Sequence, residues 1–144
     1  MTRKLALLAA MVLAVGGTAQ AQGFDPIQTR QAGQDLVAGT FGGIKAVVVA
    51  KGDVKTLENP GKAIQKWMVV FPALFPAGSD KGSTKAAPAI WSDSAGFQKA
   101  AMALGTAAGA LSTAAKAGDA AAVEAAFKEM GDACAACHKD YRLK

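Results

Sequence analysis

Residues 123–141, VEAAFKEMGDACAACHKDY, decide the fold because their larger side chains recur at the spacing of one face of an α-helix. The members of this row follow one another at steps of four and three residues: Val123, Phe127, Met130, Cys134, Cys137 and Tyr141. A second row with the same steps precedes it: Phe97, Ala101, Leu104, Ala108, Leu111 and Ala115. Two amphipathic helices in succession predict an all-α fold whose core lies between these rows.

Two further helices are expected in the first half of the chain. Asp25 followed by Pro26 is a typical helix start and predicts a first helix to about residue 51. Asn59 followed by Pro60 repeats this start, which predicts a second helix over residues 59–71, preceded by a turn over residues 54–58. We therefore expect four helices in all.

The remaining boundaries are set by proline, glycine and aspartate. Prolines and glycines over residues 72–91 predict a long irregular connection. The third helix is expected to start near Asp93 and to end at Ala117, because Gly118 follows. Asp119 then caps a fourth helix to about Arg142.

The fourth helix also carries a chemical motif. Cys134, Cys137 and His138 have the C-x-x-C-H spacing that attaches a c-type haem. Two thiols three positions apart each add to one haem vinyl group, and the adjacent imidazole then lies under the iron. The alternatives are a redox cysteine pair, which prefers a strand-turn-helix setting, and a zinc half-site, although structural zinc takes four ligands. The motif predicts one haem c per chain, attached through both cysteines, with His138 as the metal ligand.

The start of the chain resembles a secretory signal. Arg3 and Lys4 precede an apolar run of eleven residues, 5–15, and small residues flank Gln20. The run is too short for a membrane span of about 20 residues, so an uncleaved anchor is the weaker alternative. We expect residues 1–21 to be cleaved, which leaves one domain over residues 22–144 in the periplasm. The haem uses both cysteines, so no disulfide is expected there.

The charge of the mature chain is mild. The chain has sixteen Lys and Arg residues, of which two lie in the signal, and eleven Asp and Glu residues. The mature part therefore has a formal net charge of +3. The lysines are dispersed, as solvated helix faces are, and this argues against a nucleic-acid partner. No membrane partner is expected after signal cleavage, and a weak preference for acidic partners is all that follows.

The first helix has an apolar row that two polar residues interrupt. This row comprises Ile27, Arg30, Gln34, Val37, Phe41, Ile44 and Val48. Burying Arg30 or Gln34 without a partner would cost a few kcal/mol, so a polar group is expected to meet them. Haem propionates are natural acceptors for the Arg30 guanidinium, and Gln34 would then lie nearer the iron on the face opposite His138. The alternative is that this helix end is wet and both side chains are solvated.

The residues available as a sixth iron ligand are few. His138 is the only histidine, and the mature chain has only Met68, Met102 and Met130. Met130 lies on the same helix as His138 and cannot reach the opposite haem face, while Met68 and Met102 are expected to fill the core. The sequence therefore predicts a five-coordinate, high-spin iron that is open to diatomic gases.

Several segments together resemble the cytochromes c′, the class II c-type cytochromes of the bacterial periplasm. They are Arg30-Gln31, Phe41-Gly42, Pro88-x-Ile90-Trp91-Ser92-Asp93 and Cys134-x-x-Cys137-His138-x-x-Tyr141-Arg142. Only six residues follow His138, so the arrangement of ordinary small cytochromes c, with a methionine ligand later in the chain, is impossible.

The resemblance implies an antiparallel four-helix bundle, a homodimer packed through the first two helices, and a pentacoordinate haem that binds nitric oxide and carbon monoxide. It also implies roles for individual residues. Arg30 and Gln31 would contact the haem propionates, Arg142 would lie beside His138, and the loop around Thr84 and Lys85 would pass the haem edge.

Gln34 departs from the pattern of this family, because members usually carry a bulky apolar residue over the distal iron. A glutamine there could donate a hydrogen bond to a bound gas or to water. A low-spin branch of the superfamily uses a methionine near the start of the first helix as sixth ligand, and residues 24–35 contain none.

Two functions follow from these features. The first is a haem protein that binds nitric oxide and sequesters it. The alternative is a one-electron carrier in periplasmic electron transport, with an unidentified redox partner. A peroxidase-like enzyme is disfavoured because there is no distal histidine to transfer protons.

Overall fold

The computed structural model describes residues 24–144, and the expected signal segment, residues 1–21, lies outside this range. Four long helices form an antiparallel bundle: α1 (Pro26–Val49), α2 (Glu58–Val70), α4 (Ser94–Ala117) and α5 (Ala120–Tyr141). Three short helical turns connect them: η1 (Val54–Leu57), η2 (Phe71–Leu74) and α3 (Ala89–Ser92). None of the helices in residues 24–144 is long and apolar enough to cross a membrane.

The predicted helix boundaries marked by aspartate and glycine are confirmed. The Asp25 carboxylate accepts hydrogen bonds from the backbone N–H groups of Ile27 and Gln28, at 2.8 and 3.2 Å. Asp93 and Asp119 cap α4 and α5 in the same way. Gly118 ends α4 with a φ of 75°, a left-handed conformation that glycine adopts without strain.

The second helix and the turn before it are confirmed to within one residue, but the predicted cap is wrong. Asn59 is not the N-cap, because α2 already begins at Glu58 and has no side-chain cap. The turn η1 runs directly into α2, and its own cap is Asp53, which accepts a hydrogen bond from the backbone of Lys55. The segment predicted to be irregular, residues 72–91, also contains most of η2 and part of α3.

The two apolar rows of α4 and α5 form the core, as predicted. Ala108, Leu111, Ala115, Val123 and Met130 are fully buried. Of the methionines expected in the core, Met68 is buried, but Met102 is 45% exposed on the outer side of α4. That second prediction is therefore wrong, because Met102 lies outside the row that starts at Phe97.

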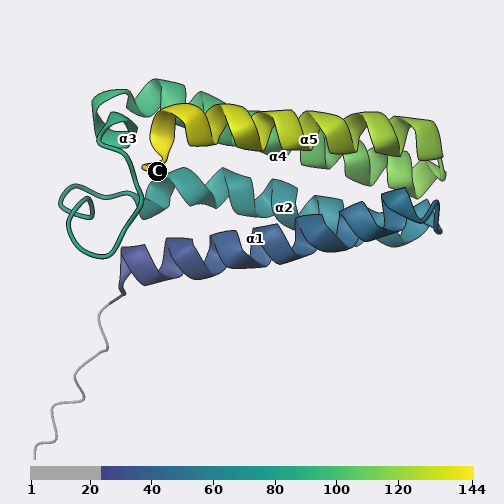
Figure 1. The fold of residues 1–144 in the computed structure, drawn as a ribbon, viewed down its shortest axis with the longest axis horizontal. Coiled ribbons are helices and arrows are strands. Elements are labelled where there is room, and N and C mark those ends of the chain that lie inside the picture. The colour runs from purple at the N-terminus through teal and green to yellow at the C-terminus, as the bar shows by residue number, and fades with distance from the viewer. Residues whose placement is uncertain (1–23) are drawn as a thin grey trace, which may run out of the picture.

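The helices leave the functional residues at one end of the bundle. Figure 1 shows the start of α1, the connection between α2 and α4, and the end of α5 together at this end. α1 approaches α2 through Gly33, where a Cβ atom would collide with the Trp67 indole ring. Near its start, α2 packs on α4 through Gly61, whose backbone lies against that of Ala108.

Candidate functional site

A large cavity separates α1 from α5. Its volume is about 1090 Å³, slightly above the range of about 300–1,000 Å³ typical of ligand pockets. α1 and α5 contribute opposite walls, while α2, η2 and α4 contribute apolar residues including Met68, Phe71, Phe97 and Leu104. The cavity is therefore apolar on its inner side and bordered by polar groups elsewhere.

The α5 wall carries the motif residues. Cys134, Cys137 and His138 all line the cavity, and both cysteines are free and half-buried. Burial raises the pKa of both thiols. Burial, and then the nearby Arg142 cation, lower the pKa of His138. The wall thus presents two protonated thiols and a neutral imidazole, the form in which histidine binds a metal.

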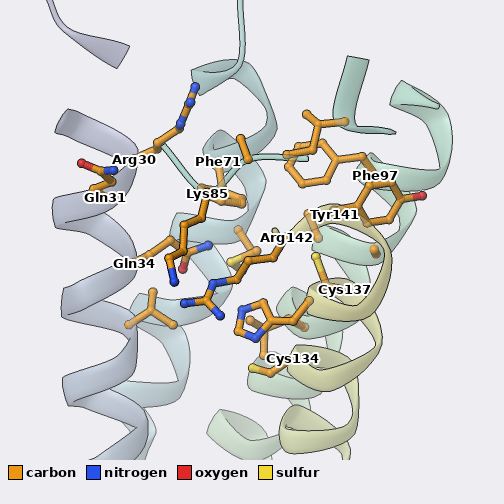
Figure 2. A pocket seen from close by; sticks show the side chains of 18 of the residues that line it. Arg30, Gln31, Gln34, Phe71, Lys85, Phe97, Cys134, Cys137, Tyr141 and Arg142 are labelled. Atoms are coloured by element: carbon orange, nitrogen blue, oxygen red, sulfur yellow. The ribbon is translucent and has the colours of Figure 1, made fainter. Parts of the chain in front are cut away.

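The α1 wall is polar near the start of the helix and apolar further along. Arg30, Gln31, Gln34 and Asp35 line the cavity first, followed by Val37, Ala38 and Phe41. Figure 2 shows Gln34 on α1 facing the space between this helix and α5, where Cys134 and Cys137 lie.

Arg30 is buried, with 3% of its surface exposed, and its partners belong to the connection between α2 and α4. One terminal nitrogen donates to Leu74 O and Ser79 Oγ, and the other donates to Ser79 O and Thr84 Oγ1. The guanidinium also lies over the Phe75 ring, 4.5 Å from its centroid. Burial lowers the pKa of Arg30, and the Asp25 carboxylate partly opposes this effect.

A polar partner for Arg30 is therefore present, and the alternative of a solvated side chain is wrong. Its contact with a haem propionate stays a prediction. Since a guanidinium has five N–H groups, only Nε–H remains without a partner among residues 24–144.

The connecting loop is also fastened to both neighbouring helices. Gln31 on α1 donates a hydrogen bond to Ser83 O at 2.8 Å. On the other side, the backbone of Leu143 donates to Lys85 O, and Ala86 forms a β-bridge with Arg142. Lys85 and Arg142 consequently lie at the mouth of the cavity (Figure 2), and neither has a carboxylate partner within residues 24–144.

Tyr141 joins the end of α5 to the start of α4. Its hydroxyl donates a 2.7 Å hydrogen bond to the Asp93 carboxylate, which also caps α4. This bond raises the pKa of Tyr141 to about 12 and lowers the pKa of Asp93. Sequence reasoning missed the pair, because residues 48 positions apart give no local pattern. Only the helix-start role of Asp93 could have directed attention to it.

The residues present fit a haem c. Two thiols and one imidazole share a wall, the cavity has apolar sides for a flat macrocycle, and two cations without carboxylate partners border its mouth. Zinc is the other metal that the motif could suggest, and in residues 24–144 no three His, Cys, Asp or Glu side chains gather as a metal-binding cluster.

A comparison with protein families shows to which family this chain belongs. The family model described as Cytochrome C′ matches residues 25–142, which include both walls of the cavity. The chain belongs to the cytochrome c′ family. Its members are non-enzymatic haem proteins, and the family implies a haem c.

Individual relatives agree with this assignment. Cytochrome c′ of Rubrivivax gelatinosus is 37% identical over 123 residues, covering 83% of this chain and 95% of the relative. A cytochrome c-556 of Agrobacterium tumefaciens (strain B2A) is 36% identical over 122 residues, covering 82% and 97%. Identity therefore relates this chain to proteins with both names.

Solved cytochrome c′ structures share the fold. That of Thermochromatium tepidum has a TM-score of 0.77 at 35% identity and covers 83% of this chain and 95% of its own. A ferrous variant of cytochrome c prime from Alcaligenes xylosoxidans was solved with bound nitric oxide. It has a TM-score of 0.75 at 33% identity and covers 83% and 94% of the two chains.

Proposed function

We propose that this cytochrome c′ family member carries one haem c, joined to Cys134 and Cys137, with a five-coordinate iron that binds nitric oxide and carbon monoxide. His138 is its single protein ligand. The observation that carries the proposal is the composition of the α1 wall. Its cavity-lining residues include Gln34, Val37 and Phe41 but neither histidine nor methionine.

The chain's own residues give this site its properties. The haem would supply an iron that can take a diatomic gas as a ligand. His138 meets it as a neutral imidazole, because burial and Arg142 disfavour the protonated ring and so lower its pKa. Lys85, Arg142, Gln31 and the remaining N–H of Arg30 are the donors near the cavity mouth for the two propionates. Phe71, Phe97 and Leu104 exclude water from the inner side.

Met68 is the residue that most directly challenges an open site. It borders the cavity from α2, yet it is 2% exposed and its Cβ packs close to Gly105 of α4. The test compares absorption and electron paramagnetic resonance spectra of the holoprotein and its Met68→Leu variant. We expect the same high-spin spectrum for both. A low-spin spectrum that becomes high-spin in Met68→Leu would overturn the proposal.

Nitric oxide sequestration is the role that we propose for this site, since relatives in the same family bind the gas. Titration of the ferrous holoprotein with nitric oxide and carbon monoxide should show one gas molecule bound per haem. Failure to bind either gas, together with rapid one-electron exchange, would favour an electron carrier instead.

We also propose that residues 1–21 are a cleaved signal and that the mature protein, residues 22–144, works in the periplasm. The support is the charged and apolar pattern of the first residues together with a haem type that bacteria attach outside the cytoplasm. Mass spectrometry of the periplasmic protein should find a chain that starts at Gln22 and carries one haem. A full-length chain in the membrane fraction would contradict this.

We further propose a homodimer packed through α1 and α2. The outer face of α1 bears no charge along a row of exposed small and apolar residues: Ala32, Leu36, Gly39, Gly43, Ala46 and Ala50. Leu36 is 74% exposed, and Val69 and Val70 of α2 are 62% and 50% exposed. A helix face of this kind is typical of close helix pairing. Leu36→Glu should give a monomer in analytical ultracentrifugation, whereas Met102→Glu on α4 should not.

A further inference from the structure

We infer that Gln34 is a hydrogen-bond donor to the ligand bound at the iron, so that this protein favours small ligands whose outer atoms accept hydrogen bonds, such as azide and nitrite. The inference rests on the proposed function. It names the class of ligand that the open site prefers and the side chain that selects it.

The first observation is that the Gln34 amide is available. Gln34 is half-buried and lines the cavity, and none of the side-chain hydrogen bonds among residues 24–144 involves it. The neighbouring polar residues of α1 differ in this respect. Arg30 and Gln31 both donate to the connecting loop. Asp35 also lines the cavity without a hydrogen-bond partner, but its side chain is exposed and has no N–H to donate. Gln34 is thus the half-buried donor of this wall that has no partner within the described part of the chain.

The second observation is its level along the bundle. Phe41 of α1 stacks on Phe127 of α5, with ring centroids 4.7 Å apart, which fixes the register of the two antiparallel helices. Seven residues separate Phe41 from Gln34 and eleven separate Phe127 from His138. At 1.5 Å per residue, Gln34 lies ~10 Å and His138 ~16 Å from this stack, both towards the cavity mouth.

The side chains reduce this difference in level. Every Cα–Cβ bond in an α-helix tilts towards the N-terminus of its own helix. Because α1 and α5 are antiparallel, the Gln34 side chain leans towards the mouth and the His138 side chain leans away from it. The two therefore converge on the same level from opposite walls. A planar group held by His138 would therefore have Gln34 on its other side.

The chemistry of an amide at this place is selective. Its N–H donates to ligands with negative or lone-pair-rich outer atoms, such as azide or nitrite, and it offers little to carbon monoxide. An apolar side chain of similar size would donate no hydrogen bond to azide or nitrite, nor to carbon monoxide. Carbon monoxide is nevertheless a useful probe, because a donor beside it lowers its stretching frequency.

The experiment uses the haem-loaded protein and three variants: Gln34→Leu, Gln34→Glu and, as a matched control, Gln28→Leu. Gln28 is an exposed glutamine of α1 that does not line the cavity. Two quantities are measured: the carbon–oxygen stretching frequency of the ferrous carbon monoxide complex and the dissociation constant of azide for the ferric protein. The absorption spectrum of each protein is recorded first.

In Gln34→Leu we expect a higher stretching frequency and azide binding weakened about 3- to 10-fold, the loss of one hydrogen bond. Gln34→Glu should weaken azide binding further through charge repulsion, and Gln28→Leu should change neither quantity. Unchanged values in Gln34→Leu, with a five-coordinate spectrum, would overturn this inference and leave the proposed function standing. A low-spin, six-coordinate spectrum of the unsubstituted protein would overturn both.

Discussion

α1 and α4 are helices of equal length, 24 residues, with opposite roles in the bundle. α4 buries nine residues, including Phe97, Leu104 and Leu111. α1 buries only three, and one of them is Arg30. The contrast shows that α4 is the centre of the protein core, whereas α1 is mainly a wall of the cavity and a face of the surface.

The glycines repeat this difference. Gly61 of α2 lies so close to α4 that a Cβ atom would be 2.8 Å from Ala108 O, and Gly105 lies close to Met68. By contrast, three of the four α1 glycines, Gly39, Gly42 and Gly43, have open space around them, and only Gly33 lies tightly, against the Trp67 ring of α2. Tight packing therefore defines the pairing of α2 with α4, and α1 is free to carry residues chosen for ligands or for a second subunit.

The largest expected effect is in the core. Leu111→Ala removes a fully buried side chain and should lower the free energy of unfolding by about 2–5 kcal/mol. Val37→Ala on the cavity wall of α1 should lower it by only about 1 kcal/mol, because Val37 is half-buried. Urea unfolding monitored by circular dichroism measures both. Equal losses would show that α1 is part of the core after all.

Arg30 is the exception within α1, since it holds the connecting loop. Arg30→Met should lower the free energy of unfolding by about 1.5–3 kcal/mol, because it removes charged hydrogen bonds to buried oxygens. Hydrogen exchange should show faster exchange of the Ser79 amide, and Arg30→Lys should give a smaller effect. If loop exchange stays slow in Arg30→Met, the guanidinium does not fasten the loop.

A matched pair of glycine substitutions should have opposite signs. Gly61→Ala should destabilise the protein by about 1–2 kcal/mol, since the clash with Ala108 exceeds the helix-forming gain of about 1 kcal/mol. Gly39→Ala should stabilise it by about 0.5–1 kcal/mol, because its surroundings are open. Thermal unfolding of the monomeric fraction compares them, and effects of the same sign would contradict the contrast between α1 and α2.

The fold was predictable wherever a residue acts locally. Asp25, Asp93 and Gly118 mark helix ends through bonds to neighbouring residues, and the row that starts at Phe97 is buried as its spacing indicates. The predicted turn before the second helix is present as η1, but the cap predicted at Asn59 is wrong, because α2 continues directly from this turn and begins one residue earlier, at Glu58.

The site was predictable in part. The motif located Cys134, Cys137 and His138 on one wall, and the period of α1 placed Gln34 on the facing wall. The loop partners of Arg30 and the bond between Tyr141 and Asp93 depend on how an irregular connection folds back. No local pattern encodes such contacts.

The smallest effect is expected from pH. Because its pKa is lowered, Asp93 adds stability above its ordinary value of 3.8, which is lost as pH falls through the lower folded value. Tyr141 has a raised pKa, so its contribution is present below pH 10 and is lost as pH rises from 10 to about 12. The free energy of unfolding, measured across both pH ranges, should depend less on pH in Tyr141→Phe than in the unsubstituted protein. Asp93→Asn keeps a helix cap and should reduce this pH dependence too. An unchanged pH dependence in both variants would show that the pair is not coupled to folding.

The resonance Raman spectrum of the purified ferric and ferrous holoprotein tests the central claim most directly, namely that α5 holds the haem and α1 offers no protein ligand. We predict marker bands of a five-coordinate, high-spin haem in both states and an iron–histidine stretch in the ferrous protein, with His138 as the only candidate. Bands of a six-coordinate, low-spin haem in the unliganded protein would contradict the account.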